Sequence, residues 1–124
     1  MKKILVADDK ASSRELIRAV LEHSGYLIEE AADGREALEC ALRQDPDLIL
    51  LDLQMPQLDG FAVLAELRKH ERFQKLPIVA LTAYAMQGDR EKALDAGFTS
   101  YVTKPVNLAE LRHHVAELLE TAAR

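Results

Sequence analysis

The sequence contains no tryptophan, few aromatic residues and one cysteine, Cys40. A lone cysteine excludes an intramolecular disulfide, and because Cys40 stands among apolar positions of a predicted helix, we interpret it as a small core residue. Long apolar runs are also missing. The run at residues 4–7 stops at two aspartates, far short of the core of a signal peptide, and no other run approaches membrane-spanning length.

Positive charge is in deficit, with 16 Lys and Arg against 21 Asp and Glu and a formal net charge of -5. This balance argues against a general surface for nucleic acid or anionic membranes, so we expect neither as a direct partner. Any DNA-binding output would lie on a partner protein. The 124 residues are the size of one domain, and we assign residues 1–124 to one cytoplasmic domain without a linker or repeat.

The segment that organises the chain begins with four consecutive apolar residues, 48–51, and ends at Asp52 and a loop that contains Pro56. This pattern predicts a strand that is buried on both faces and carries Asp52 at its C-terminal tip. We expect the Asp52 carboxylate to be presented there, not buried. In open parallel α/β sheets, ligands collect beyond the carboxyl ends of the strands.

Four further segments are strand-like, at residues 3–7, 26–31, 77–81 and 101–103. Asp8 and Asp9 follow the first, Thr82 follows the third, and Lys104 follows the fourth. The second carries two charges and the fourth is short, so we place both at the sheet edges. The remaining three strands are apolar throughout and are predicted to be central.

Helical periodicity fills the segments between these strands. The predicted helices run from a capping box at Ser12 and Glu15 to Gly25, from Gly34 to Asp45, from Gly60 through Leu67, from about Met86 to Ala96, and onward from the cap Asn107. Asp33 and Asp59 precede glycines and are interpreted as turn and cap residues. The fourth helix has only Met86, Ala93 and Leu94 as apolar anchors, so we expect it to be comparatively mobile.

Five βα units in alternation predict an α/β fold: a doubly wound, flavodoxin-like (βα)5 parallel sheet with strand order 2-1-3-4-5 and helices on both faces. This order brings Asp8, Asp9, Asp52, Thr82 and Lys104 to one end of the sheet. Two carboxylates about 4 Å apart repel by ~4 kcal/mol at an effective dielectric near 20. A cluster of three therefore needs a cation or raised pKa values, and carboxylate and carbonyl oxygens are the ligands that Mg²⁺ prefers.

Beside a metal ion, the Asp52 carboxylate could be a further ligand, or it could attack phosphorus and form an acyl phosphate. The Lys104 ammonium and the Thr82 hydroxyl would then stabilise the oxygens of the phosphoryl group during its transfer. Each of these side chains alone has a simpler interpretation, as a solvated loop lysine or a β-branched strand end. Their common position at strand tips makes the phosphoryl-transfer interpretation the better one.

On these residues the chain resembles a receiver domain of a bacterial two-component response regulator, of the stand-alone type without an output domain. The resemblance covers residues 3–120 and rests on Asp8-Asp9, on Asp52 within DLILLDLQMP, on Thr82-Ala83 and on Lys104-Pro105. It implies that Asp52 accepts a phosphoryl group from a histidine kinase or a histidine phosphotransfer protein, and that a downstream protein reads the result. Such a domain is a signalling module and not an enzyme.

The resemblance also assigns roles to individual residues. It implies that Mg²⁺ is held by Asp8, Asp9, Asp52 and the backbone carbonyl of Gln54. Thr82 and Tyr101 would form the switch, on a surface made by the fourth helix, the fifth strand and the fifth helix.

Two further expectations concern the site. Gln54 and Tyr84 differ from the fast-hydrolysing chemotaxis receivers, so we expect them to slow dephosphorylation. We also expect a cis peptide bond between Lys104 and Pro105, since a bend there turns Lys104 back over the site.

Three other functions compete with this interpretation. A phosphatase with an aspartyl nucleophile wants a second acid two residues after Asp52, where this chain has Gln54. A flavin-binding module would have to hold phosphate beside Asp8 and Asp9, which would repel it. A pseudo-receiver that is never phosphorylated stays open as an alternative.

The four histidines fall on predicted helices away from the strand tips and are interpreted as surface residues: His23, His70, His113 and His114.

Overall fold

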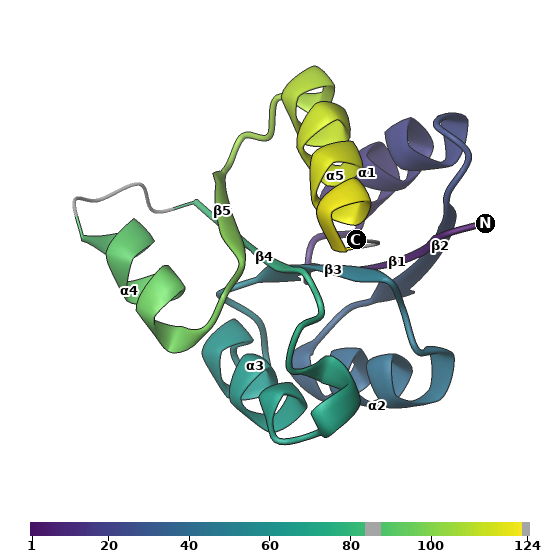
Figure 1. Cartoon of the computed structure of the whole chain (residues 1–124). Helices are drawn as coiled ribbons and strands as arrows, with labels where there is room; N and C mark the ends of the chain where they lie inside the picture. The colour runs from purple at the N-terminus through teal and green to yellow at the C-terminus, as the bar shows by residue number, and fades with distance from the viewer. Residues whose placement is uncertain (84–87, 123–124) are drawn as a thin grey trace.

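The computed structural model describes residues 1–83 and 88–122. Strands and helices alternate along the chain as predicted (Figure 1). The elements are β1 Lys3–Ala7, α1 Ala11–His23, β2 Leu27–Ala31, α2 Gly34–Gln44, β3 Leu48–Asp52, α3 Gly60–Arg68, a 3-10 turn η1 Glu71–Phe73, β4 Ile78–Thr82, α4 Asp89–Ala96, β5 Ser100–Thr103 and α5 Leu108–Ala122.

The five strands form one parallel sheet in the order β2-β1-β3-β4-β5, which confirms the predicted topology. Helices α1 and α5 cover one face of this sheet, and α2, α3 and α4 lie on the other side (Figure 1). β3 and β4 are buried along their whole length, whereas β5 at the edge is only half-buried. The apolar strands are therefore central and the charged and short ones are at the edges.

Side chains alternate between the two faces of each central strand and build two cores. Leu5, Ile49 and Leu51 point toward α2 and α3, where Cys40 is buried as predicted. Ile4 and Leu50 point toward α1 and α5. The same strands thus supply both cores, which explains why they have no polar face.

The beginning of α1 differs from the prediction. The helix starts at Ala11 with Lys10 as its cap residue, and no side chain accepts a capping hydrogen bond at that position, so the predicted capping box from Ser12 is wrong. Instead, Oδ1 of Asp8 accepts a hydrogen bond from the Lys10 backbone N–H at 2.9 Å. The start of the helix is therefore hydrogen-bonded to the Asp8 carboxylate at the end of β1, and not to the Ser12 side chain.

The other predicted caps are confirmed. The side chains of Asp33, Asp59 and Asn107 each accept a hydrogen bond from a backbone N–H three residues later, at 2.8, 2.9 and 3.0 Å. Gly25 follows α1 with φ 97°, in the left-handed conformation that glycine adopts at helix ends.

The apolar stripes of two helices are thinner than their sequences indicate. Leu16 on α1 is 59% exposed and Leu94 on α4 is 39% exposed, while Ala93 is fully buried. The predicted start of α4 near Met86 lies outside the described residues, and the described helix begins at Asp89. In the part of the chain that the structure covers, no helix is long and apolar enough to cross a membrane.

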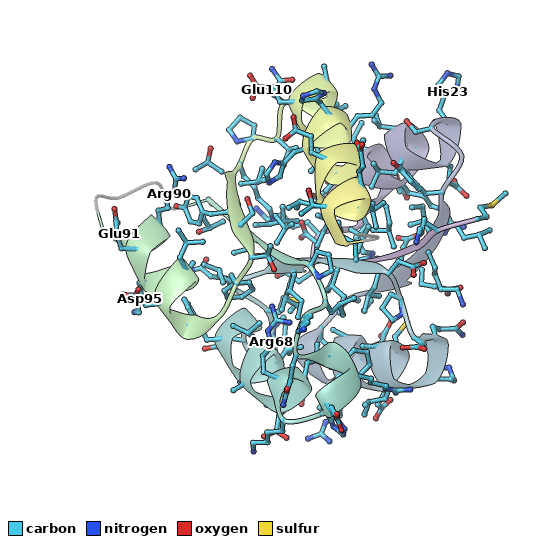
Figure 2. The ribbon with its side chains drawn as sticks, in the orientation of Figure 1. His23, Arg68, Arg90, Glu91, Asp95 and Glu110 are labelled. Atoms are coloured by element: carbon cyan, nitrogen blue, oxygen red, sulfur yellow. The ribbon has the colours of Figure 1, made fainter. Side chains whose placement is uncertain are left out.

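The side chains of His23 on α1, Asp95 on α4 and Glu110 on α5 point outward (Figure 2). His70 and His113 are also exposed. His114 departs from the predicted surface position because it is half-buried and hydrogen-bonded to the Ser100 hydroxyl.

Candidate functional site

The predicted site residues meet at the carboxyl end of the sheet. Asp52 is the last residue of β3, Thr82 is the last residue of β4, and Asp8 directly follows β1. β3 lies between β1 and β4, so its tip is flanked by the other two. Because parallel strands end at the same edge of a sheet, the residues at these three tips lie close together.

Lys104 joins two of these tips. Its ammonium Nζ donates hydrogen bonds to Oδ2 of Asp8 at 2.7 Å and to Oδ2 of Asp52 at 2.8 Å. The Lys104 backbone N–H donates to the Thr82 carbonyl oxygen at 2.7 Å, and the Lys104–Pro105 peptide bond is cis, as predicted. A residue at the edge of the sheet thus places its charge between the two central carboxylates.

The carboxylate of Asp52 is buried, contrary to the expectation that it is presented. Asp52 is 4% exposed and Asp8 is fully enclosed. The burial has two causes that the strand pattern does not contain: Lys104 covers one side of the carboxylates, and the loop after β3 folds back so that the Gln54 N–H donates to Oδ1 of Asp52 at 2.9 Å. Asp9, next in the chain to Asp8, is the exposed acid of the group.

The two buried carboxylates respond differently to the same ammonium. Burial raises the pKa of Asp8, but hydrogen bonds from Lys104, the Lys10 backbone and the Ser13 side chain outweigh it, and the pKa lies below its ordinary value. Burial also raises the pKa of Asp52, and there Lys104 and the Gln54 N–H only partly offset the effect. Burial lowers the pKa of Lys104, but its two carboxylate partners more than reverse this, so Lys104 stays charged.

The acids lie close enough to share a cation. Each of Asp8, Asp9 and Asp52 offers a carboxylate oxygen, and these oxygens all lie within 4.8 Å of one another. Asp9 and Thr82 also line a pocket of about 620 Å³ that leads in from the surface. Three carboxylates with an open side suit a hard divalent ion that keeps part of its water, so the residues fit Mg²⁺.

The remaining predicted residues lie around this pocket or on the neighbouring edge. Gln54 is exposed and lines the pocket together with Lys92, whose ammonium lies 5.6 Å from the centre of the Phe61 ring. Tyr101 is half-buried on β5 and packs against the core on the α2 and α3 side. Tyr84 lies outside the described residues.

Sequence reasoning missed three residues that support the acidic cluster. Ser13 donates a hydrogen bond to Asp8, and Arg14 donates to the Asp8 backbone carbonyl at 2.7 Å. Gly60 packs so closely that a Cβ there would lie 2.5 Å from the carbonyl oxygen of Asp52. A glycine directly after the cap Asp59, where a better helix former would otherwise be expected, was the available signal for this contact.

Residues 4–116 match the family model described as response regulator receiver domain. Among curated proteins, the chain is 36% identical over 107 residues to the polar-differentiation response regulator DivK of Brucella ovis, covering 86% of this chain and 87% of that protein. It is also 37% identical to the DNA-binding dual master transcriptional regulator RpaA of Synechocystis, along 100% of this chain but 52% of that protein. The chain thus spans about half the length of the curated transcriptional regulators that it matches.

Solved structures show the same similarity. The receiver domain of the Francisella response regulator 1452 superposes with a TM-score of 0.91 at 33% identity and covers 98% of each chain. The receiver domain of the sensor histidine kinase PA1611 from Pseudomonas aeruginosa superposes with a TM-score of 0.88 at 39% identity, over 96% of this chain and 98% of that one. The second structure is described as having a magnesium ion coordinated in its active site cleft.

Proposed function

The chain belongs to the response regulator receiver domain family of two-component systems, and from that premise we propose that Asp52 is its phosphoacceptor. An Asp52 oxygen forms a bond to phosphorus while the bond between phosphorus and a histidine nitrogen of the donor breaks, and that nitrogen keeps the electron pair. The donor is a histidine kinase or a histidine phosphotransfer protein. The domain signals through its own modified state and turns over no substrate.

The observation that carries this proposal is the position of the Lys104 ammonium, 2.8 Å from Oδ2 of Asp52 and 2.7 Å from Oδ2 of Asp8. A fixed cation beside the attacking carboxylate is placed to stabilise the charge that spreads over the phosphoryl oxygens in the transition state. The Thr82 hydroxyl, at the tip of the adjacent strand, would donate to another of these oxygens. A structural lysine would need only one partner, whereas this one bridges two buried acids.

A divalent cation is part of the proposal. Asp8, Asp9 and Asp52 would hold Mg²⁺ together with the Gln54 backbone carbonyl, and the ion would supply electrostatic neutralisation of the phosphoryl oxygens. The magnesium reported for the receiver of PA1611 supports this assignment. In this chain, burial raises the pKa of Asp52 and the Asp8 charge raises it further, so a bound cation would stabilise the ionised carboxylate.

The proposed signalling output is a change in the surface that a downstream protein would contact. We propose that Thr82 and Tyr101 couple the phosphoryl group to α4, β5 and the start of α5, where a downstream protein would bind. The assignment of residues 1–124 to one domain and its cytoplasmic location remain predictions of the same proposal.

The test is phosphorylation of the purified chain by acetyl phosphate with Mg²⁺, followed by mass spectrometry of the modified residue. We expect one labelled residue, Asp52, and no label in D52N or after chelation of the metal. D59N is the matched control, because Asp59 lines the same pocket and its side chain caps α3. Label on a residue other than Asp52 would contradict the proposal, and no label at all would favour the pseudo-receiver.

A further inference from the structure

An arginine from the first turn of α1 holds the turn that carries the acidic pair. Nη1 of Arg14 donates a hydrogen bond to the backbone carbonyl oxygen of Asp8 at 2.7 Å, and the Arg14 side chain is only 17% exposed. This carbonyl belongs to the peptide plane that joins Asp8 to Asp9. Because a peptide unit is planar, the contact fixes the direction in which the chain leaves β1 toward Asp9.

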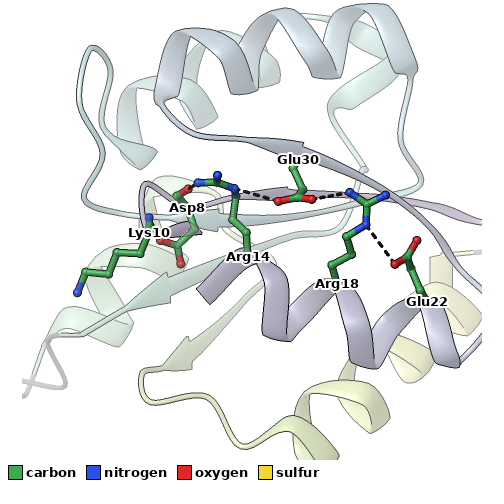
Figure 3. Close-up of polar contacts among 6 residues, drawn as sticks. All are labelled: Asp8, Lys10, Arg14, Arg18, Glu22 and Glu30. Atoms are coloured by element: carbon green, nitrogen blue, oxygen red, sulfur yellow. Dashed lines mark hydrogen bonds and ion pairs between the residues drawn. The ribbon is translucent and has the colours of Figure 1, made fainter. Parts of the chain in front are cut away.

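Glu30 on β2 holds this arginine in turn. Nε of Arg14 donates to Oε1 of Glu30 at 3.0 Å, and the other Glu30 oxygen accepts a hydrogen bond from Arg18. Arg18 also donates to Glu22 at 3.1 Å, so the network runs along α1 as Figure 3 shows. A guanidinium group is a rigid planar fork, and two partners at fixed positions determine its orientation.

Asp9 is the acid of the cluster that depends most on this turn. Asp8 and Asp52 are buried and are each hydrogen-bonded to Lys104 and to a backbone N–H. Asp9 is exposed, so packing does little to place it. Its position therefore follows from the backbone that precedes it, which is the segment that Arg14 contacts.

We propose that Arg14 is a positioning residue for the metal site, which sets the Asp9 carboxylate within reach of the cation through the Asp8 carbonyl group. The inference rests on the proposed function, since it takes a divalent cation as the ligand of the three acids. Replacing a residue that orients metal ligands without touching the metal typically costs roughly 10–100-fold in metal affinity. Arg14 would act in this way through the main chain.

The charge of Arg14 would by itself have the opposite effect, because a positive charge near the site repels a metal ion. Two features reduce this repulsion. The guanidinium group contacts a carbonyl oxygen of Asp8 and not its carboxylate, and two arginines and two glutamates form the network, so its formal charge is zero. The hydrogen bond from Arg18 lowers the pKa of Glu30, with a further contribution from Arg14, so this glutamate is ionised at neutral pH.

The two effects predict opposite results when Arg14 is shortened. If positioning dominates, R14A weakens Mg²⁺ binding, and if charge dominates, R14A strengthens it. R18A is the matched control, because Arg18 also pairs with Glu30 but makes no contact with Asp8 in the hydrogen bonds of the described residues. Both variants remove one arginine from the same network, and only one of them releases the Asp8 carbonyl.

The experiment is calorimetric titration of Mg²⁺ into the wild type, R14A and R18A, with urea unfolding of each. We expect the Kd for Mg²⁺ to rise roughly tenfold in R14A, the lower end of the effect of lost support for a metal ligand. In R18A it should change by no more than about threefold, the size expected of a partly exposed ion pair. R14K keeps the positive charge but lacks the planar guanidinium group, so its Kd for Mg²⁺ should lie between those of R14A and the wild type. If R14A does not fold, R14K is compared with R18A in its place.

A phosphorylation measurement gives a second readout. The Mg²⁺ concentration for half-maximal labelling by acetyl phosphate should rise in R14A more than the maximal rate falls, because the defect lies in metal binding. Equal Mg²⁺ affinities in R14A and R18A, or a higher affinity in R14A, would overturn the inference. If the wild type binds Mg²⁺ but Asp52 is not labelled, the proposed function is refuted and this inference stands. If the wild type does not bind Mg²⁺, both are refuted.

Discussion

Asp8 and Asp52 share the ammonium group of Lys104, yet their pKa values shift in opposite directions. Both carboxylates are buried, and burial is the largest influence on each. The difference lies in the other donors of the described residues, since Asp8 also receives hydrogen bonds from the Lys10 backbone and from Ser13, whereas the further donor to Asp52 is the Gln54 N–H. The acid proposed as phosphoacceptor is thus the one whose charge the protein leaves less well stabilised.

This asymmetry predicts opposite stability changes for two isosteric substitutions. Because the pKa of Asp52 is raised in the folded state, its ionised form costs stability, so D52N should stabilise the protein at pH 7. Because the pKa of Asp8 is lowered, its ionised form contributes stability, and D8N should destabilise by about 1–3 kcal/mol, the size of a hydrogen bond to a charged group. Urea unfolding in the presence of a chelator measures both.

The pH dependence separates these charge effects from packing. The gain in D52N should be constant above the folded pKa of Asp52, shrink as the pH falls through it, and vanish below about 3.9, the value for an unfolded aspartate. The loss in D8N should be constant above about 3.9, shrink as the pH falls below that value, and vanish below the lowered folded pKa of Asp8. Parallel shifts of the same sign in both variants would contradict the assignment.

A second prediction concerns the close approach of α3 to the site. A Cβ at residue 60 would lie 2.5 Å from the Asp52 carbonyl oxygen and 2.8 Å from the Leu53 Cα, both on the backbone, so G60A forces the loop after β3 to move. We expect a loss of about 1–3 kcal/mol, as for other overpacked positions. The rate of labelling of Asp52 should fall as well.

The control is G25A, because no atom lies within 4 Å of a Cβ there but φ is 97°. That strain should cost about 1–2 kcal/mol and leave the labelling rate unchanged. A normal labelling rate in G60A would mean that the loop can move without displacing Asp52.

The positions of the strand tips could be predicted because apolar runs that end at charged residues identify both the strands and their carboxyl ends. β3 illustrates this, since Leu48–Asp52 is the strand that the sequence predicts. The short connections and right-handed crossovers then leave one natural strand order. The strand tips that flank Asp52, those of β1 and β4, follow from this order.

Contacts that depend on the path of a loop could not be predicted. The burial of Asp52 results from the return of the chain at Gln54, and the pairing of Arg14 with Glu30 results from the angle between α1 and β2. The error at Ser12 has the same origin. A cap sequence is local, whereas the Asp8 carboxylate that contacts the helix start is placed by the sheet.

A third prediction concerns the switch. A beryllofluoride complex, as a stable mimic of the phosphorylated state, should change the amide NMR signals of β5, of the described part of α4 and of the Lys104–Pro105 segment. A shift from about 1% to about 99% active requires that the phosphoryl group favour the active state by ~5.5 kcal/mol. D52N with beryllofluoride is the control, and unchanged signals over residues 88–106 in the wild type would place the switch elsewhere.

The last prediction is a phosphorylated state that outlives that of the fast chemotaxis receivers. Hydrolysis needs a water molecule in line with the bond between phosphorus and Asp52, and Gln54 lines the pocket that leads to the site. A glutamine side chain can orient water but cannot accept its proton. We expect the ring of Tyr84, predicted at the mouth of the same pocket, to exclude water.

Q54E supplies the missing base and should speed dephosphorylation roughly tenfold or more. This is below the ~10²–10⁴-fold effect of a well-placed base because residue 54 is exposed. Q54M, of similar size and without hydrogen-bonding capacity, should be no faster than the wild type, and Y84A should be faster. The decay of the label after removal of acetyl phosphate gives the dephosphorylation rate of the wild type and of the three variants. Equal rates in Q54E and Q54M would exclude proton transfer at residue 54 from the mechanism.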